Sequence, residues 1–217
     1  MTTTSLLTLL QGAGNTLLLA LLAIAAGVPV GLAMALVRWR NVPILSSLIA
    51  AYVSIMRPAP LVTLCLLMFF MLPTVGLEVP PLAAAVLALG LNTAAFNCEI
   101  WRASLAAIPK DQLEAGVAFG FSRWQSFRRI VLPQLWRSSL GPLVSEMTLL
   151  LKITPAASVI GIVDITRTAS RIGAQTYDPL PPFLVATLLY TAIIALMVWG
   201  QRVIERRIAQ RYGYTTP

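Results

Sequence analysis

The chain has 217 residues, of which 58% are hydrophobic and 11% are charged, whereas a soluble domain carries about 25% charged residues. The formal net charge of +8 would suggest a nucleic-acid partner in a soluble protein. Here the basic residues lie between long apolar segments, so membrane topology explains them better and we expect no nucleic-acid partner. The composition argues against a soluble domain and indicates an all-α, polytopic membrane protein.

Histidine is absent from the sequence, and cysteine occurs only at Cys65 and Cys98, both inside apolar runs. The most common general base and metal ligand is therefore missing. Two isolated cysteines in apolar runs are expected to be buried free thiols. We expect no catalytic residue and no metal site, so the chain is not expected to be an enzyme.

Apolar segments separated by polar stretches follow one another along the chain. A helix needs about 20 apolar residues to cross the hydrocarbon of a bilayer. Residues 41–56 are uncharged but too few, and they contain several serines, so we expect a short interfacial or bundle-packing helix there. The sequence predicts one transmembrane domain over residues 1–217, with five membrane-spanning helices at residues 16–37, 59–75, 82–100, 140–163 and 183–200.

Gly27 and Gly31 are spaced as a pair of small residues four positions apart in the first predicted span. Such a pair allows a second helix to approach closely, and Pro29 between them can bend the helix. The alternative is a plain turn that faces lipid.

The distribution of Lys and Arg gives the expected orientation. Most of the 16 basic residues fall on the side that carries the polar segment 102–137, and Arg167 and Arg171, in a predicted polar loop at residues 164–182, fall on the opposite side. Because positively charged loops stay in the cytoplasm, we expect the N-terminus outside and the C-terminus in the cytoplasm. No basic residue precedes Arg38, so we expect no cleaved signal peptide.

The polar segment 102–137 has at its centre, from Glu114 to Pro133, the layout of two short helices around one glycine. Pro109 suits the first turn of a helix that continues through Phe119. Gly120 stands where a helix ends on a left-handed residue, a conformation that glycine adopts without strain.

The second short helix is predicted to begin after Ser122. Gln125 follows three residues later and completes a capping box. Arg123 to Val131 then forms the helix, and Pro133 stops it or starts the next one. This segment is rich in apolar side chains, which leaves two alternatives: it lies on the lipid surface, or it docks another protein.

Charged residues inside the predicted spans are functional candidates, because a charge in the hydrocarbon costs at least about 2.5–3.5 kcal/mol. Lys152 lies about 18 Å along the fourth span from Leu140, close to mid-membrane. Glu146 lies six residues earlier and therefore on another face of the helix. Lys152 either binds the carboxylate of a translocated solute or belongs to a structural ion pair.

Several polar residues accompany these two charges. Pro155 has no N–H and frees the carbonyl of Leu151, and Asn92 in the third span is a hydrogen-bond donor to another helix or a path residue. The candidate substrate path consists of Lys152, Thr154, Ser158, Asn92 and Glu146.

Three charged residues at span ends have simpler interpretations. Glu99 and Arg102 are three residues apart and are expected to form a local pair. Arg57 is expected to anchor a helix end at the lipid headgroups.

The polar segment resembles the EAA loop of ATP-binding-cassette (ABC) importer permeases, whose pattern is Glu-Ala-Ala-x3-Gly-x9-Ile-x-Leu-Pro. The chain departs from it at Gly116, where the family usually has its second alanine; this glycine loosens the first helix by about 1 kcal/mol. In the family, this loop fits a groove on the cytoplasmic ATPase subunit. The resemblance implies an ATPase-docking loop that includes Glu114, Ala115, Gly116, Gly120, Ser122, Trp124, Ile130, Leu132 and Pro133.

Three further segments resemble the polar-amino-acid group of these permeases. They are YVSIMRPAPLVTLCLLMFFMLP at residues 52–73, NTAAFNCEIWRASLAAIPKDQLEAG at residues 92–116 and LLLKITPAASVIG at residues 149–161. The chain departs from the group where Pro58 and Ala59 replace Gly-Thr, where Ile153 replaces an Asp, and where Pro155 and Ala156 replace Ser-Leu. These departures leave the identity of the solute open.

The resemblance implies a type I ABC importer permease (MetI-like) architecture in the bacterial cytoplasmic (inner) membrane. The implied function is a permease subunit that forms the translocation path for a polar amino acid or similar small solute. The alternatives are the same machine for an opine, an osmolyte or a sulfur compound, or a secondary transporter.

Partners follow from what the chain lacks and from the resemblance. The sequence has no G-x4-G-K-[ST] motif, so we expect that it binds no cofactor and that ATP and Mg are used by a separate subunit. The resemblance implies ABC ATPase subunits, a second permease subunit, paralogous or identical, and an extracytoplasmic solute-binding protein.

Overall fold

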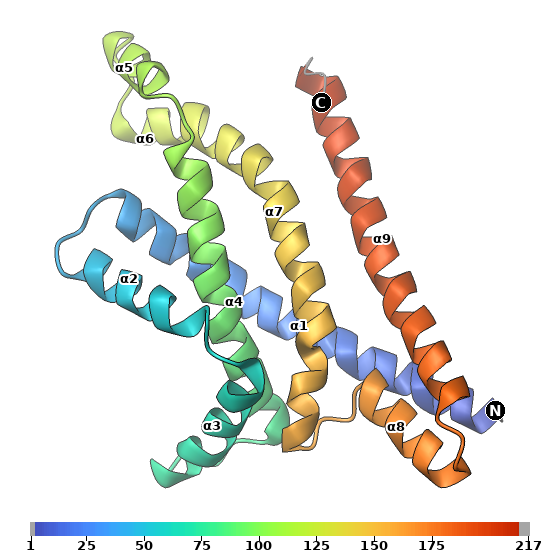
Figure 1. Cartoon of the computed structure of the whole chain (residues 1–217). Coiled ribbons are helices and arrows are strands. Elements are labelled where there is room, and N and C mark those ends of the chain that lie inside the picture. The colour runs from blue at the N-terminus through green and yellow to red at the C-terminus, as the bar shows by residue number, and fades with distance from the viewer. Residues whose placement is uncertain (1–2, 213–217) are drawn as a thin grey trace.

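The structure, a computed structural model, describes residues 3–212, with side chains described through residue 207. Within this range the chain is helical and no strand occurs, which confirms the all-α prediction (Figure 1). The elements are α1 (Thr3–Trp39), α2 (Leu45–Met56), α3 (Leu61–Thr74), α4 (Pro81–Ala106), α5 (Lys110–Ala118), α6 (Arg123–Ser126), the π-helix η1 (Phe127–Val131), α7 (Leu132–Ile153), the 3-10 helix η2 (Thr154–Ile160), α8 (Ile165–Thr176) and α9 (Leu180–Tyr212).

Four continuous helices are long and apolar enough to cross a membrane: Thr3–Trp39, Pro81–Ala106, Arg123–Ile160 and Leu180–Arg207. A fifth crossing is available if α2 and α3 together form one broken span, since they meet at 111°. Helix α3 alone has 14 residues, or about 21 Å, which is shorter than the ~30 Å of hydrocarbon. Helix α3 by itself is therefore too short for the span predicted at 59–75, which stays a prediction.

The predicted second helix of the polar segment is present, because α6 and η1 cover Arg123 to Val131 and α7 starts at Leu132, as the alternative that Pro133 starts the next helix had it. Helix α7 follows without a break, so it begins eight residues before the predicted span at 140. Pro133 lies in the first turn of α7. A π turn directly precedes it, in which the Leu132 N–H donates to the Phe127 carbonyl, and the helix continues through this turn. The predicted polar loop 164–182 contains a helix, α8, whose buried face lies against α1 and α9.

Helix α1 packs against α4 along its glycine pair. A Cβ atom added to Gly27 would lie 2.7 Å from Cγ2 of Thr93, and one added to Gly31 would lie 2.7 Å from Cβ of Asn97 and 2.9 Å from the Ala94 carbonyl oxygen. These distances are too short for a side chain, so the glycines let the backbones of two helices touch. The lipid-facing alternative is therefore wrong.

Charged side chains join α1 to α4 at one end of this contact. Glu99 pairs with Arg102 on its own helix at 2.7 Å and also with Arg38 at the end of α1. The predicted local pair is confirmed, and the structure adds the link between helices. Cys65 and Cys98 are buried free thiols, as predicted.

A polar cluster joins α1 to α8 and α9 at the other end of the molecule. The buried Asp164 caps α8 by accepting hydrogen bonds from the N–H groups of Thr166 and Arg167, and it accepts a third from the Tyr190 hydroxyl at 3.2 Å. The Ile165 N–H donates to the Thr16 hydroxyl of α1. These contacts hold the exposed polar face of α8 at a fixed place.

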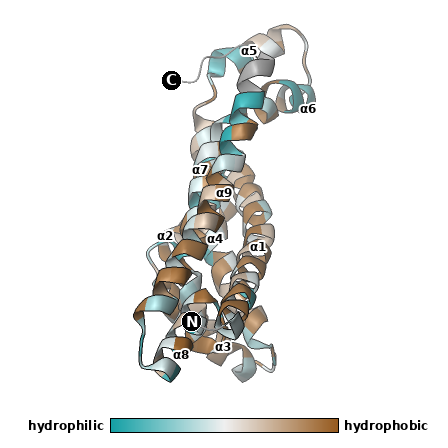
Figure 2. Cartoon of the chain, turned by 90° about the vertical axis from the view of Figure 1, so that its right-hand side faces the viewer, coloured by the Kyte–Doolittle hydropathy of each residue, from teal (hydrophilic) through white to brown (hydrophobic). Residues whose placement is uncertain are grey.

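The two ends of the molecule differ in character. Helices α5 and α6 lie at the end where α9 finishes, and α8 lies at the opposite end beside the start of α1 (Figure 1). Hydrophilic residues gather around α5 and α6, and hydrophobic residues dominate the helices below them (Figure 2). The polar segment therefore projects beyond the apolar body.

The α1–α4 contact can be tested with matched valines. We expect Gly31→Val to lower the free energy of unfolding by roughly 1–3 kcal/mol, as overpacking does in other cores, because the new side chain meets backbone atoms of α4. Gly14→Val, on the same helix with nothing within 4 Å of an added Cβ, should melt like the wild type. Equal melting temperatures of both variants in detergent would contradict the close contact.

Candidate functional site

The polar segment folds as a helix, a glycine turn and a second helix, as predicted. Gly120 has a φ angle of 76°, so the turn uses the left-handed conformation that ends helix α5. Ser122 and Gln125 form both bonds of the capping box: the Ser122 hydroxyl accepts from the Gln125 N–H at 3.3 Å, and the Ser122 N–H donates to Oε1 of Gln125 at 2.8 Å. The predicted capping box is confirmed.

Gly116 has a packing reason that sequence reasoning missed. It is the buried residue of α5, and a Cβ added to it would lie 2.8 Å from Cδ1 of Ile130 and 3.4 Å from the Ser126 hydroxyl. The glycine lets α5 lie directly on the second helix of the segment. Because the nearest atom is the flexible tip of Ile130, the alanine usual in the family would require only a small side-chain movement.

The outer surface of this segment is apolar and open. Val117 is 69% exposed, Phe119 83% and Trp124 67%, and the Trp124 ring stacks on Phe127 with 5.9 Å between centroids. Glu114 and Ala115 are exposed on α5, Leu132 is exposed on α7, and Ile130 and Pro133 are half-buried. An exposed apolar surface at the hydrophilic end of the molecule is typical of a protein-docking site.

A second group of candidate residues surrounds the break between α2 and α3. Pro60 has no N–H to bond the carbonyl of Met56 four residues earlier, and the buried Asn92 donates to that oxygen at 2.8 Å. Asn92 lies 11 residues after Pro81, or about 16 Å along α4, which is near the middle of the bilayer. Asn92 therefore replaces a missing backbone bond at mid-membrane depth.

This bond also places Arg57, the residue after Met56, beside α4, and its position at the lipid headgroups stays a prediction. Its guanidinium lies over the Phe96 ring of α4, 5.1 Å from the centroid, and lines a 550 Å³ cavity with Arg38, Ser54 and Glu99. Arg57 is also the cation whose field acts on the buried carboxylate of Glu146. The sequence signal was available, because Arg57 stands between two helices in a proline-rich break.

The remaining path candidates lie at the end of α7. Thr154 is fully buried and donates to the Leu151 carbonyl at 2.8 Å, so it occupies the acceptor that Pro155 leaves free. The Ser158 carbonyl accepts a hydrogen bond from Arg167 of α8. Lys152 is exposed and makes no ion pair within residues 3–207, so no structural pair within this part of the chain explains it.

The structure thus separates the predicted path residues into two groups. Asn92 and Thr154 are committed to backbone carbonyls that prolines leave without a donor. The side chains of Glu146 and Lys152, on different faces of α7, make no hydrogen bond or ion pair in the described part of the chain. The last two, with Arg57, remain able to interact with a solute.

The two glycines of the polar segment should respond differently to alanine. Gly116→Ala should leave the free energy of unfolding nearly unchanged, because a helix-propensity gain of up to ~1 kcal/mol offsets the displacement of the Ile130 tip. Gly120→Ala should lower it by about 1–2 kcal/mol, because a Cβ strains the left-handed conformation although nothing lies near it. Thermal melts of both variants check this, and a larger loss for Gly116→Ala would contradict the α5 packing described above.

Comparisons with known proteins place the chain in one family. Residues 27–210 match the family described as "Binding-protein-dependent transport system inner membrane component". The L-cystine transport system permease protein TcyB of Bacillus subtilis is 35% identical to this chain, and the match covers 89% of this chain and 83% of the TcyB sequence. The nopaline transport system permease protein NocM of Agrobacterium fabrum is 35% identical, over 96% of this chain and 92% of its own.

A solved structure agrees with this placement. The crystal structure of an amino acid ABC transporter with histidines has a chain that superposes with a TM-score of 0.86 at 29% identity, covering 95% of this chain and 100% of that one. The predicted type I importer permease fold is therefore confirmed. The chain belongs to this family of binding-protein-dependent transport components: it is the inner-membrane permease subunit of an ABC importer, a transport subunit whose ATPase is a separate protein.

Proposed function

We propose that this permease carries a polar amino acid, or a small derivative that keeps the amino-acid carboxylate, and that its polar segment docks the ATPase. The observation that carries the docking role is the exposed apolar surface of Val117, Phe119 and Trp124 at the hydrophilic end of the molecule. The capped helix–glycine–helix beneath it is rigid enough to pass a movement of the ATPase to α7, because η1 runs into α7 without a break.

The solute class is supported by the named relatives. TcyB is named for L-cystine and NocM for nopaline, and both compounds carry carboxylates. These two names also favour the sulfur-compound and opine alternatives over an osmolyte that lacks a carboxylate.

The translocation path is supported by charges that the chain itself does not neutralise. Arg57 offers a guanidinium and Lys152 an ammonium to a carboxylate, and Glu146 offers a carboxylate to an ammonium group. A zwitterionic solute has both complementary charges. Thr154 and Asn92 border this region and use their side chains to support its backbone. Ser158 accepts from Arg167 through its backbone carbonyl, so its hydroxyl stays a candidate for the path.

A second permease subunit, paralogous or identical, would complete the path. Along α7 an exposed stripe contains Ser138, Pro142, Ser145, Leu149 and Lys152. Serines and a lysine are poor neighbours for lipid tails, so this stripe suits a facing protein or water-filled path. In this assembly the basic end with α5 and α6 faces the cytoplasm, α8 faces the solute-binding protein, and ATP and Mg are bound by the ATPase.

Isolation of the assembly tests the proposal directly. We expect the affinity-tagged permease to co-purify with an ABC ATPase, and ATP-dependent uptake into proteoliposomes to select one of L-cystine, L-glutamine, L-arginine and nopaline when the binding protein is supplied. Uptake that continues without the ATPase would indicate a secondary transporter. Uptake of glycine betaine alone would indicate an osmolyte carrier that binds neither amino acids nor opines.

The docking role predicts a specific uncoupled variant. Glu114 is exposed on α5 and makes no contact that the fold needs, so Glu114→Lys should leave the protein folded in the membrane. Uptake should fall about tenfold or more, because reversing a charge at a docked surface weakens the binding free energy of the ATPase. The expected loss equals that of one charge-assisted hydrogen bond, ~1.5–3 kcal/mol. Asp111→Lys, one turn earlier on α5, is the matched control. Normal uptake by Glu114→Lys would count against docking at this residue.

The path assignment predicts a loss of solute affinity without a loss of assembly. We expect Lys152→Gln and Glu146→Gln each to raise, about tenfold or more, the solute concentration that gives half-maximal stimulation of ATP hydrolysis. The reason is that hydrogen bonds to charged groups are worth ~1.5–3 kcal/mol. Arg202→Gln, an exposed residue of α9, serves as the control. If both path variants kept the wild-type concentration dependence, Lys152 and Glu146 would have a structural role.

A further inference from the structure

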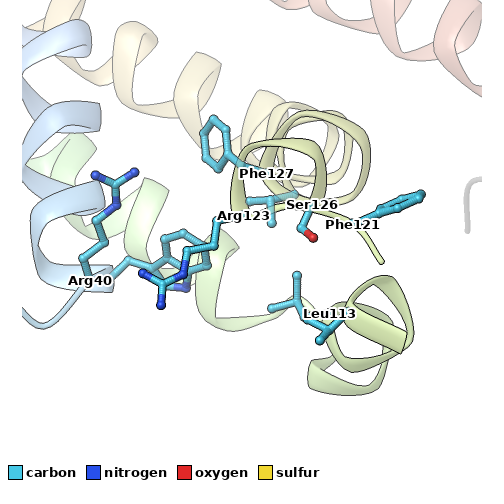
Figure 3. A pocket seen from close by; sticks show the side chains of 9 residues that line it. Arg40, Leu113, Phe121, Arg123, Ser126 and Phe127 are labelled. Carbon is cyan, nitrogen blue, oxygen red and sulfur yellow. The ribbon is translucent and has the colours of Figure 1, made fainter. Parts of the chain in front are cut away.

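A groove of about 680 Å³ lies between the end of α1 and the polar segment. Its walls come from Trp39 and Arg40 of α1, from Leu113 of α5, and from Arg123, Ser126 and Phe127 of α6 and η1. Figure 3 shows Arg40 and Arg123 on the same side of the groove, on separate elements, with the Ser126 hydroxyl facing Leu113. A water molecule takes about 30 Å³ in the liquid, so the groove has room for a hydrated phosphate group.

The polar groups of the groove have no partners of their own. Within the described part of the chain, the guanidinium groups of Arg40 and Arg123 make no ion pair or hydrogen bond, and the described lining includes no acidic residue. The Ser126 hydroxyl is buried and has no hydrogen-bond partner among the described residues. Two guanidinium groups that line one groove without an acidic neighbour favour the binding of an anion there.

The level of the groove identifies the source of the anion. Helix α1 is uncharged from Thr3 to Val37 and carries exposed leucines on its surface, and its first charges are Arg38 and Arg40 on either side of Trp39. This change from apolar to basic and aromatic residues marks the boundary between hydrocarbon and headgroups. The groove therefore opens where the phosphates of the same leaflet lie.

We propose that this groove binds the headgroup of an anionic phospholipid, with its phosphate held by Arg40 and Arg123. Arginine forks bind phosphate oxygens in pairs, and Trp39, Leu113 and Phe127 offer an apolar wall to the glycerol and the first methylenes. The headgroup fills a gap, because α1 makes no extensive contact with α5 or α6. It ties the docking segment to the membrane surface.

Direct lipid binding is the first test. Delipidated, purified permease is mixed with phosphatidylglycerol or phosphatidylcholine in detergent, and retained lipid is counted by native mass spectrometry. Arg40→Gln and Arg123→Gln should each weaken retention of phosphatidylglycerol about fivefold, the factor expected for one basic residue at an anionic surface. Arg128→Gln, an exposed residue of the same segment outside the groove lining, should retain it like the wild type.

Three outcomes would overturn the proposal. The first is equal retention of phosphatidylglycerol by the wild type and both groove variants, and the second is an equal loss in Arg128→Gln. The third is full displacement of phosphatidylglycerol by inorganic phosphate, which would make free phosphate the ligand.

The consequence for coupling rests on the docking function proposed above and has its own readout. The permease–ATPase complex is placed in nanodiscs of phosphatidylcholine with increasing phosphatidylglycerol, and ATP hydrolysis is measured. Hydrolysis should rise with phosphatidylglycerol in the wild type and in Arg128→Gln, and Arg40→Gln should need about fivefold more of it. If the wild-type permease retains no ATPase, the docking proposal fails while the lipid-binding result stands. If Arg40→Gln loses the ATPase but keeps its lipid, the groove contacts the ATPase and the proposal fails.

Discussion

The structure depends on one constraint: inside a bilayer every backbone N–H and C=O must find a partner within the protein. Prolines remove a backbone donor at several places in the spans, and at two of them, Pro60 and Pro155, a polar side chain supplies the missing hydrogen bond. Asn92 bonds the Met56 carbonyl that Pro60 leaves open, and Thr154 bonds the Leu151 carbonyl beside Pro155. These two bonds leave neither carbonyl without a donor at the α2–α3 break and at the start of η2.

The breaks also concentrate charge where a solute can use it. The α2–α3 break brings Arg57 over the Phe96 ring and into the field of Glu146, and the end of α7 carries Lys152 just before η2. Discontinuous helices at the bilayer midplane are the usual place for such sites in transporters. The same prolines that interrupt the spans thus create the region proposed as the translocation path.

Rigid contacts connect this region to the docking segment. The glycine pair of α1 lets its backbone touch that of α4. Glu99 of α4 pairs with Arg38 of α1 and with Arg102 of its own helix. Gly116 lets α5 pack on the helix that continues into α7. These contacts connect α5 to the membrane helices, so a movement of α5 is expected to move α7 as well. The groove at Arg40 and Arg123 lies beside this connection, which is where the proposed lipid would act on it.

The sequence by itself determined the helical membrane class, the capped helix–glycine–helix segment and the Glu99–Arg102 pair, because hydropathy, capping and i,i+3 contacts are local. It could not determine that Asp164–Pro182 contains a helix, since α8 is stabilised by burial against α1 and α9. Nor could it choose between lipid and α4 as the neighbour of Gly27 and Gly31. The reason for Gly116 and the groove beside Arg40 were decided by tertiary structure alone, because each depends on contacts between separate helices.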